Sequence, residues 1–359
     1  MIYRARTSKA VSAWIADRRG AWSGGAGFQP ARAGCDPAPH CPGFFLYRGF
    51  TGCPAWAEGQ PCSYCYLRTT FRTDPELREG VCWVTDIGDC DQCDRLDQHD
   101  RLGTCESPDC PPDISSARAA VEKWLAAEPL RECRHDGEWD IIPFVLNAGE
   151  LADSLAFPPE ENPHIARLLD LFSDPATNPH GHKLLLLTKA GLQATQAHLG
   201  CHPERSEGPR VPSPNIILSW SVGTESDAER YWDPQLDRLR AAVVAARAAW
   251  RVRLRLDPLS YIGPWFVYNL ANQVARLSAS SAQSTDGRFP ELITLGTLRH
   301  RGGRPKLPAP ERASIYRAAL EGLRAGGYEG EIGLCKETPA MIRDVLGIEP
   351  ESMRCNCVP

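Results

Sequence analysis

The chain lacks any apolar run that approaches the roughly 20 residues needed to cross a bilayer, which argues against a membrane-spanning protein. Its N-terminal stretch has no uninterrupted apolar segment of the kind that secretory signal peptides carry. It also lacks an excess of positive charge, because 40 Lys and Arg face 45 Asp and Glu and the formal net charge is −5. A global basic field that attracts nucleic acid is therefore excluded. We expect a cytoplasmic protein whose chemistry depends on local sites.

Cysteine, in contrast, is abundant. The 359 residues include 15 cysteines, an odd number, and several of them stand in C-x-x-C pairs. Without an export signal, this pattern favours metal or cluster ligation in a reducing compartment over a disulfide framework. The hydrophobic fraction of 42% and the charged fraction of 24% are those of a globular protein.

Short apolar runs alternate with helical patterns along most of the chain. The runs are bounded by turn formers and span residues 44–47, 141–147, 183–188, 215–221, 252–257, 291–296 and 331–335. Helices are predicted between them at 163–173, 190–199, 234–250, 265–280, 311–325 and 339–346, the third beginning with Asp233 as N-cap and Pro234 as first residue. Strands that alternate with helices predict an α/β fold with a parallel sheet, here an open or partial (β/α) barrel.

The chain divides into three parts by pattern. Residues 1–40 are rich in Gly, Ala and Arg and predict a poorly ordered segment with a short helix near 8–17. Residues 41–359 carry the barrel pattern. Within them, residues 68–140 form a cysteine-rich insertion that is too long for a βα loop and has one convincing helix, at 115–127.

Three cysteines follow the first apolar run: Cys53, Cys62 and Cys65. Three thiolates are one too few for a closed tetrahedral zinc site, and soft thiolates also select iron–sulfur clusters. We therefore predict a [4Fe–4S] cluster with one iron left free for a ligand. The alternative is a structural zinc site that Cys41 or Cys82 completes.

A second cysteine group lies in the insertion. Its two pairs predict either a four-thiolate zinc site or an auxiliary iron–sulfur cluster, between which the spacing does not decide, with Cys90, Cys93, Cys105 and Cys110 as ligands. The alternative is a set of unligated cysteines. Cys335, Cys355 and Cys357 form a third candidate thiolate group near the barrel mouth, unless Cys335 is simply buried as an apolar residue.

Polar residues follow the predicted strands, at the ends where (β/α) barrels hold their active sites. They are Gly149, Glu150 and Asp153 after the second strand, Lys189 after the third, Ser219 and Ser221 at the end of the fourth, and Arg255 and Asp257 in the fifth. Each has a structural alternative. Glu150 and Asp153 suit the first turn of a helix, Lys189 a solvated loop, and Arg255 with Asp257 an ion pair.

These motifs, in this order, resemble the spore photoproduct lyase-like family of radical S-adenosylmethionine (SAM) enzymes. The resemblance is carried by CSYCYLRTT after Cys53, and by NAGELADSL (147–155), LLLLTKAG (185–192), ILSWSVG (217–223), RLRLDPL (253–259), ITLGTLR (293–299) and LCKE (334–337). It covers about residues 44–357, apart from the insertion.

The resemblance implies a partial barrel of the radical SAM type, a [4Fe–4S] cluster on Cys53, Cys62 and Cys65, and SAM bound at its free iron. It implies that the enzyme cleaves SAM reductively and abstracts a substrate hydrogen through the 5′-deoxyadenosyl radical. SAM would be bound by residues at the strand ends, namely Tyr64, Gly149, Glu150, Asp153, Lys189, Ser219 and Ser221. A reducing partner such as flavodoxin or ferredoxin would supply the electron.

The sequence departs from the family pattern in two places, which limits how far the resemblance predicts its reaction. Eight residues separate Cys53 from Cys62, where the usual triplet has three. The region from Asn147 to Asp153 has no cysteine, whereas the lyase carries its hydrogen donor there. The sequence therefore predicts a lyase-like relative, and not a true spore photoproduct lyase, acting on an unidentified substrate. The alternatives are repair or modification of a nucleic acid by the same chemistry, and a non-enzymatic, zinc-stabilised binding module.

Overall fold

The computed structural model describes the backbone in fourteen stretches of the chain. They are residues 4–5, 15–17, 45–47, 81–82, 114–133, 139–149, 153–159, 162–200, 210–223, 234–259, 263–280, 289–297, 307–335 and 337–357. All structural statements below concern these residues.

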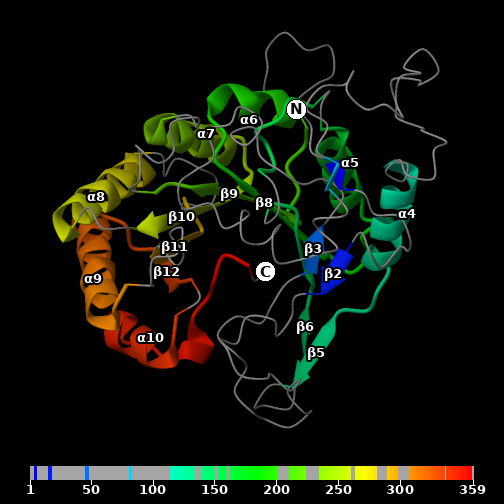
Figure 1. Cartoon of the computed structure of the whole chain (residues 1–359). Helices are drawn as coiled ribbons and strands as arrows, with labels where there is room; N and C mark the ends of the chain where they lie inside the picture. Colours follow the sequence, from blue (N-terminus) through cyan, green and yellow to red (C-terminus); the bar gives the residue numbers. More distant parts are fainter. Residues whose placement is uncertain are drawn as a thin grey trace.

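One curved sheet organises the molecule (Figure 1). Its order is β12-β11-β10-β9-β8-β7-β3-β2, and every pairing from β3 to β12 is parallel, while β2 runs antiparallel to β3. The strands are β2 (Ile15–Asp17), β3 (Phe45–Tyr47), β7 (Val145–Asn147), β8 (Lys183–Thr188), β9 (Ile216–Ser221), β10 (Arg251–Leu259), β11 (Leu292–Thr297) and β12 (Glu331–Leu334). The predicted α/β partial barrel is confirmed.

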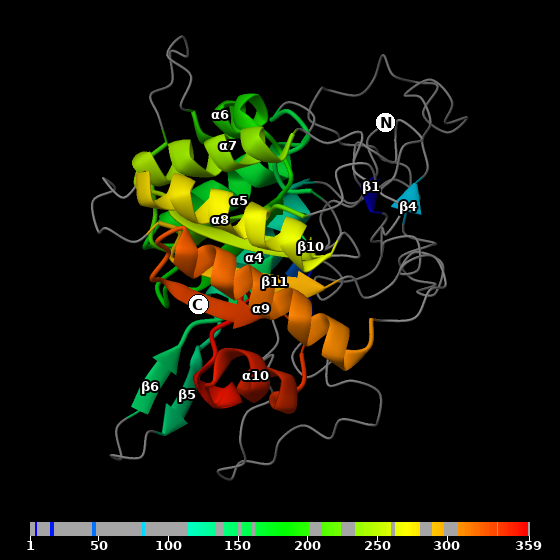
Figure 2. The ribbon, with the colours of Figure 1, turned by 90° about the vertical axis from the view of Figure 1, so that its left-hand side faces the viewer.

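Helices cover the convex side of this sheet, as Figure 1 and Figure 2 show. They are α4 (Ile114–Leu125), α5 (Pro163–Ser173), α6 (Leu192–Leu199), α7 (Gln235–Arg247), α8 (Pro264–Ser280), α9 (Ala309–Ala325) and α10 (Pro339–Leu346), with a short 3₁₀ helix at Pro350–Ser352. Each predicted helix from 115–127 onward is present, with ends that differ from the prediction by three residues at most. Among the helices described, none is long and apolar enough to cross a membrane.

The prediction of a single strand at 141–147 is wrong. The run divides into β6 (Trp139–Ile142), which pairs antiparallel with β5 (Leu130–Cys133), and β7, which joins the main sheet. Pro143 lies between the two strands. Proline has no backbone N–H to donate to a ladder, which accounts for the break.

Two predictions near helix ends are wrong. The predicted helix at 8–17 is not formed over its last residues, where Ile15–Asp17 pair as β2 with β3. Pairing to an open sheet edge overrides the weak local helical pattern. Helix α7 begins at Gln235 with Pro234 as its N-cap, because Pro234 has an extended ψ of 144°; Asp233 lies outside the described residues. A separate pair joins β1 (Arg4–Ala5) to β4 (Val81–Cys82).

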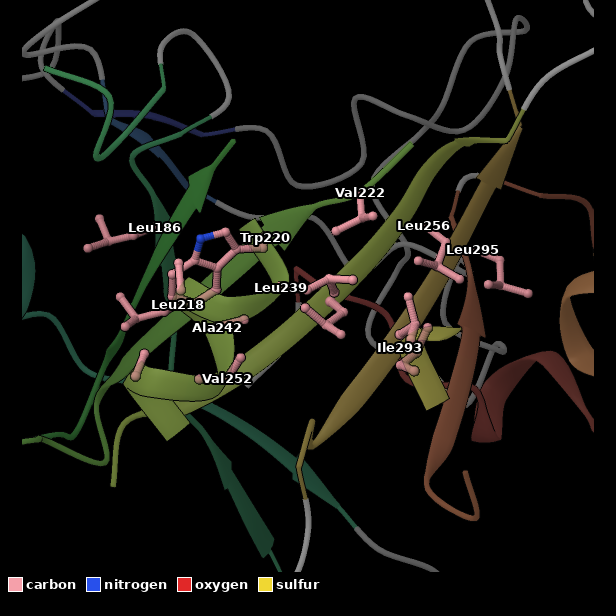
Figure 3. Close-up of a cluster of buried hydrophobic side chains, with 14 of the residues drawn as sticks. Leu186, Leu218, Trp220, Val222, Leu239, Ala242, Val252, Leu256, Ile293 and Leu295 are labelled. Carbon is pink, nitrogen blue, oxygen red and sulfur yellow. The ribbon is translucent and has the colours of Figure 1, made fainter. Parts of the chain in front are cut away.

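The main core lies between the sheet and its helices. Trp220 on β9 is 0% exposed, and its indole Nε1 donates to the Ala190 carbonyl at 3.1 Å. Figure 3 shows Trp220 together with side chains from β8, β10, β11 and α7. Alanines on α7, such as Ala242, have little side chain, so the helix backbone can approach the sheet closely. This packing fixes which side of each strand faces away from the helices.

Candidate functional site

The site is built on the concave face of the sheet, which is opposite the helices and is called the inner face below. Because side chains alternate along a strand, Ser219 and Ser221 point away from the side that buries Trp220. The pairing between neighbouring strands places inner-face residues side by side, in rows that run across the sheet. One row contains Leu187, Ser219 and Arg253, and the next, toward the carboxyl ends, contains Ser221, Arg255 and Thr294.

Gly149 lies directly against the next strand. Its backbone N–H donates to Asn147 Oδ1 at 2.9 Å, and a Cβ at this position would lie 2.5 Å from Leu187 Cβ. No side chain fits into that space, so glycine is required here for the loop after β7 to pack on β8. The structure thereby assigns Gly149 a positioning role. Glu150, predicted beside it, lies outside the described residues.

Asp153 joins the loop after β7 to the end of β8. Its Oδ1 accepts from Thr188 Oγ1 at 2.6 Å and from the backbone N–H groups of Leu155 and Ala156, and its Oδ2 accepts from the Lys189 N–H at 2.6 Å. Burial raises the pKa of this carboxyl, and the hydrogen bonds from Thr188 and the backbone oppose that rise. Asp153 lies in no described helix, so the alternative of a helix-terminal charge is wrong.

Lys189 is the residue that Asp153 positions. It follows β8 directly, its backbone is held by the carboxylate, and its side chain is half-buried. A loop lysine in free solvent would show neither feature. Lys189 therefore begins at the carboxyl edge of the sheet, directly after β8, with its backbone held by Asp153.

The predicted ion pair on β10 is formed. Arg255 Nη2 lies 2.7 Å from Asp257 Oδ2, and both side chains are mostly buried. The carboxylate also packs on Gly296 of β11, where a Cβ would lie 2.7 Å from Asp257 Cγ. The pair is on the inner face, and the interpretation of Arg255 and Asp257 as an ion pair is confirmed, while a substrate-side role for them stays a prediction.

A segment near the C-terminus crosses the inner face. We call residues 353–357 the C-terminal strap. Its residue Met353 lies against β12, where Leu334 N–H donates to Met353 Sδ at 3.2 Å, and Asn356 lies over β9 and β10. Ser219 Oγ donates to Asn356 Oδ1 at 2.9 Å, and Arg253 Nη1 donates to the Asn356 carbonyl at 2.8 Å. Figure 1 shows this red segment running into the concave side.

The strap changes the role predicted for Ser219. Ser219 is 0% exposed, and its hydroxyl is directed at Asn356. Ser221, one row nearer the carboxyl ends, is only partly buried. The sequence contained one signal of the strap, the Cys355-x-Cys357 pair, but nothing that placed it over β9.

A charged cluster holds the base of the strap. Arg251 and Arg253 both contact the Glu291 carboxylate, at 2.9 Å and 2.5 Å. Burial alone would raise the pKa of Glu291, but hydrogen bonds and charge from the two arginines hold that pKa below its usual value. Arg354 of the strap pairs with Glu331 of β12 at 2.6 Å. Paired arginines and glutamates therefore hold the strap at the amino ends of β10, β11 and β12.

The predicted cluster ligands cannot be placed. Tyr64 and the ligand sets Cys53, Cys62, Cys65 and Cys90, Cys93, Cys105, Cys110 lie outside the described residues. Within the described part of the chain, no three His, Cys, Asp or Glu side chains are arranged to hold a metal ion. The third predicted thiolate group, formed by Cys335, Cys355 and Cys357, is therefore wrong: Cys355 is buried beside Asn356, and the three do not converge as ligands.

Several buried polar atoms on and beside the inner face find no hydrogen-bond partner among the described residues: Asn147 Nδ2, Thr294 Oγ1 and Asn356 Nδ2. Native proteins satisfy nearly all such atoms through protein, water or ligand. The face therefore fits a polar molecule such as SAM. A pocket of about 370 Å³ between α9, α10 and β12 is lined by Glu331 and Ile332 at the amino end of β12 and by Met353 and Arg354 of the strap.

No protein-family model and no curated protein matches the chain. Solved structures of spore photoproduct lyase show some likeness. One complexed with dinucleoside spore photoproduct has a TM-score of 0.39 and 13% identity, over 75% of this chain and 58% of that chain. A mutant with bound AdoMet and dinucleoside spore photoproduct has a TM-score of 0.36 and 12% identity, over 72% and 56%.

Another mutant of the same lyase has a TM-score of 0.42 and 11% identity, over 79% of this chain and 74% of that chain. The match to the first of these structures spans less than two thirds of that lyase's length. At these values the likeness carries no argument about function, which must rest on the motifs and on the geometry of the inner face.

Proposed function

We propose that the protein is a cytoplasmic radical SAM enzyme of the lyase-like type, with an unidentified substrate. One observation carries the proposal. Strand β3 leads directly into the cysteine loop and runs parallel to β7, β8 and β9 in one sheet. Their carboxyl ends share one edge, so the loop that starts after Tyr47 leaves from the edge that carries Gly149, Lys189 and Ser221.

The residues would divide the binding of SAM between them. Cys53, Cys62 and Cys65 would hold the [4Fe–4S] cluster. When bound, the cluster would supply one-electron chemistry, with a donor such as flavodoxin or ferredoxin as the source of the electron: SAM would be cleaved to methionine and a 5′-deoxyadenosyl radical, which would take a hydrogen atom from the substrate. The cofactor supplies the difficult chemistry, and the protein supplies orientation and exclusion of water.

At the strand ends, Lys189 would pair with the SAM carboxylate and Ser221 would hydrogen-bond the same molecule. Tyr64 would pack near the adenine, and Glu150 would accept from a ribose hydroxyl or the ammonium group. Gly149 and Asp153 act indirectly in this scheme, since one permits close packing of the loop and the other holds Lys189 in place. The C-terminal strap covers the amino-terminal side of the space.

Anaerobic purification tests this proposal. We expect a brown protein with about four irons per cluster that forms 5′-deoxyadenosine from SAM after reduction. Cys62→Ala should abolish both the cluster and the cleavage, while Cys201→Ala, which is in no predicted ligand set, should change neither. A colourless protein that holds zinc alone would instead support the zinc-stabilised binding module, and cleavage by Cys62→Ala would show that the ligand assignment is wrong.

Iron counting also decides the nature of the second cysteine group. If Cys90, Cys93, Cys105 and Cys110 hold an auxiliary cluster, the wild type carries about eight irons, and replacing Cys93 with alanine removes about half of them. If they hold zinc, the same variant loses one zinc and keeps its iron.

One surface feature favours a substrate with planar rings, such as a nucleic acid. Trp265 and Phe266, in the first turn of α8, are 68% and 53% exposed, and their rings meet edge to face at 4.9 Å between centroids. Helix α8 follows the carboxyl end of β10, so the pair is on the side of the barrel mouth. Exposed aromatic rings stack with nucleobases, worth about 1–3 kcal/mol per base.

A further inference from the structure

The C-terminal strap closes the inner face at the level of Ser219, and this has a consequence for ligand binding. A molecule that enters from the carboxyl ends of the strands meets the partly buried Ser221 in the outer row. Below that row it meets Asn356, because Asn356 covers the Ser219 hydroxyl and the Arg253 guanidinium. The strap is thus the floor of the space, and Asn356 is its polar residue over β9.

The side-chain amide of Asn356 is fixed in orientation. Its Oδ1 accepts from Ser219 Oγ, and its backbone carbonyl accepts from Arg253. Because the amide oxygen accepts from Ser219, the amide nitrogen lies on the opposite side of the amide group from that hydrogen bond. That atom, Nδ2, is buried and finds no hydrogen-bond partner among the described residues, although the residue is only 2% exposed. Ser219 of β9 thus contacts the side-chain amide, and Arg253 of β10 holds the backbone of the same residue.

A buried amide N–H that lacks an acceptor destabilises a fold by about 1–3 kcal/mol. Proteins retain such a group when a ligand or an ordered water supplies the acceptor. We propose that Asn356 is a binding residue of the site: its Nδ2 donates a hydrogen bond to an acceptor atom of bound SAM, while Ser219 positions the amide from below. This inference rests on the proposed function, because the ligand it names is SAM.

The proposal assigns different roles to the two serines of β9. Ser221 contacts the ligand directly, whereas Ser219 is a positioning residue that acts through Asn356. It also explains why a serine is needed at a position that is 0% exposed: a hydroxyl there orients the strap, which an apolar side chain of similar size would not.

Equilibrium binding of S-adenosylhomocysteine tests the proposal, because this analogue binds without being cleaved. The cluster-loaded full chain is titrated by calorimetry, and thermal unfolding is recorded in parallel. Asn356→Asp keeps an oxygen for Ser219 to donate to but replaces the Nδ2 donor with an acceptor. We expect this variant to bind at least tenfold more weakly than wild type, and the melting temperature shows how much the buried carboxylate destabilises the fold.

Two further variants complete the test. Ser219→Ala frees the amide and should weaken binding by about threefold or more, since a net hydrogen bond contributes about 0.5–1.5 kcal/mol. Ser352→Ala is the matched control, because Ser352 is exposed, precedes the strap and donates to the Glu349 carbonyl; its affinity should equal that of wild type.

The outcomes separate this inference from the proposed function. If wild type binds the analogue and both Asn356→Asp and Ser219→Ala bind equally well, Asn356 is only structural and the inference is wrong. The Ser219→Ala result decides the matter if the aspartate variant does not fold. If wild type itself binds neither SAM nor the analogue, the proposed function fails, and this inference fails with it.

Discussion

The two faces of the barrel sheet use the same strands for different purposes. The helix-facing side is almost entirely apolar, with residues such as Leu186, Leu218 and Trp220 packed against alanine-rich helices (Figure 3). The inner face carries serine, arginine, aspartate and threonine in adjacent rows. The comparison teaches that stability and chemistry are separated by side-chain alternation alone, since neighbouring residues of β9 serve one or the other.

The largest expected effect concerns the helix-facing side. Trp220→Ala should lower the free energy of unfolding by about 3–5 kcal/mol, because it leaves a cavity and removes the bond to the Ala190 carbonyl. Urea unfolding measures the loss. Trp265→Ala is the control, since Trp265 is exposed and its removal should change stability by less than about 0.5 kcal/mol. Equal losses for the two tryptophans would contradict the assignment of the core.

A smaller effect is expected where the two faces meet at the strand ends. Asp153→Asn should destabilise the fold by about 1–3 kcal/mol, because an amide nitrogen would face the Thr188 hydroxyl or the Lys189 N–H in place of an acceptor.

It should also weaken binding of S-adenosylhomocysteine, since Lys189 would lose its support. Asp344→Asn, which removes only an exposed pair with Arg317, serves as the control and should cost at most about 1 kcal/mol. Unchanged stability in Asp153→Asn would show that the carboxylate does not join β7 to β8.

The smallest effect is a pH dependence at the amino end of the sheet. The Phe144 N–H donates to His182 Nδ1 at 2.9 Å, and His182 Nε2 lies 2.8 Å from the Ala127 carbonyl. Nδ1 must therefore be unprotonated. Burial lowers the pKa of His182 below its usual value of about 6.5 in the folded protein.

The unfolded chain then binds the proton more readily than the folded one. The contribution of His182 is complete above pH 6.5 or so and is lost as the pH falls toward the lowered pKa, by up to about 1.4 kcal/mol per pH unit. His182→Gln should flatten the dependence of unfolding free energy on pH below about pH 6.5. A profile as steep as that of wild type would contradict this assignment.

The fold was largely predictable from local pattern. Continuous apolar runs with turn formers on both sides located β8, β9 and β11 within a residue or so, and helices α5 and α10 have the predicted bounds. These elements are specified by their own residues. The break in the 141–147 run had a local signal as well, in Pro143.

The candidate site was predictable only in part. Gly149, Asp153 and Lys189 stand at the carboxyl edge as expected, but the contacts that define their roles join separate elements. Asn356 meets Ser219 across 137 residues of sequence and Arg253 across 103. No periodicity or spacing reports a contact of that separation. The assignment of the cysteine ligands stays a prediction, because those residues lie outside the described structure.

The same separation has a consequence for the order in which the molecule is made. Strands β9 and β10 leave the ribosome about a hundred residues before Asn356 does, yet the inner face is complete only when Asn356 reaches them. Before Asn356 is made, a chain still in synthesis can bury Trp220 and its neighbours, but the strap does not yet cover Ser219 and Arg253 on the inner face. A maturation factor that loads a cluster or a cofactor would therefore meet the complete inner face only after Asn356 has been made and has reached Ser219 and Arg253.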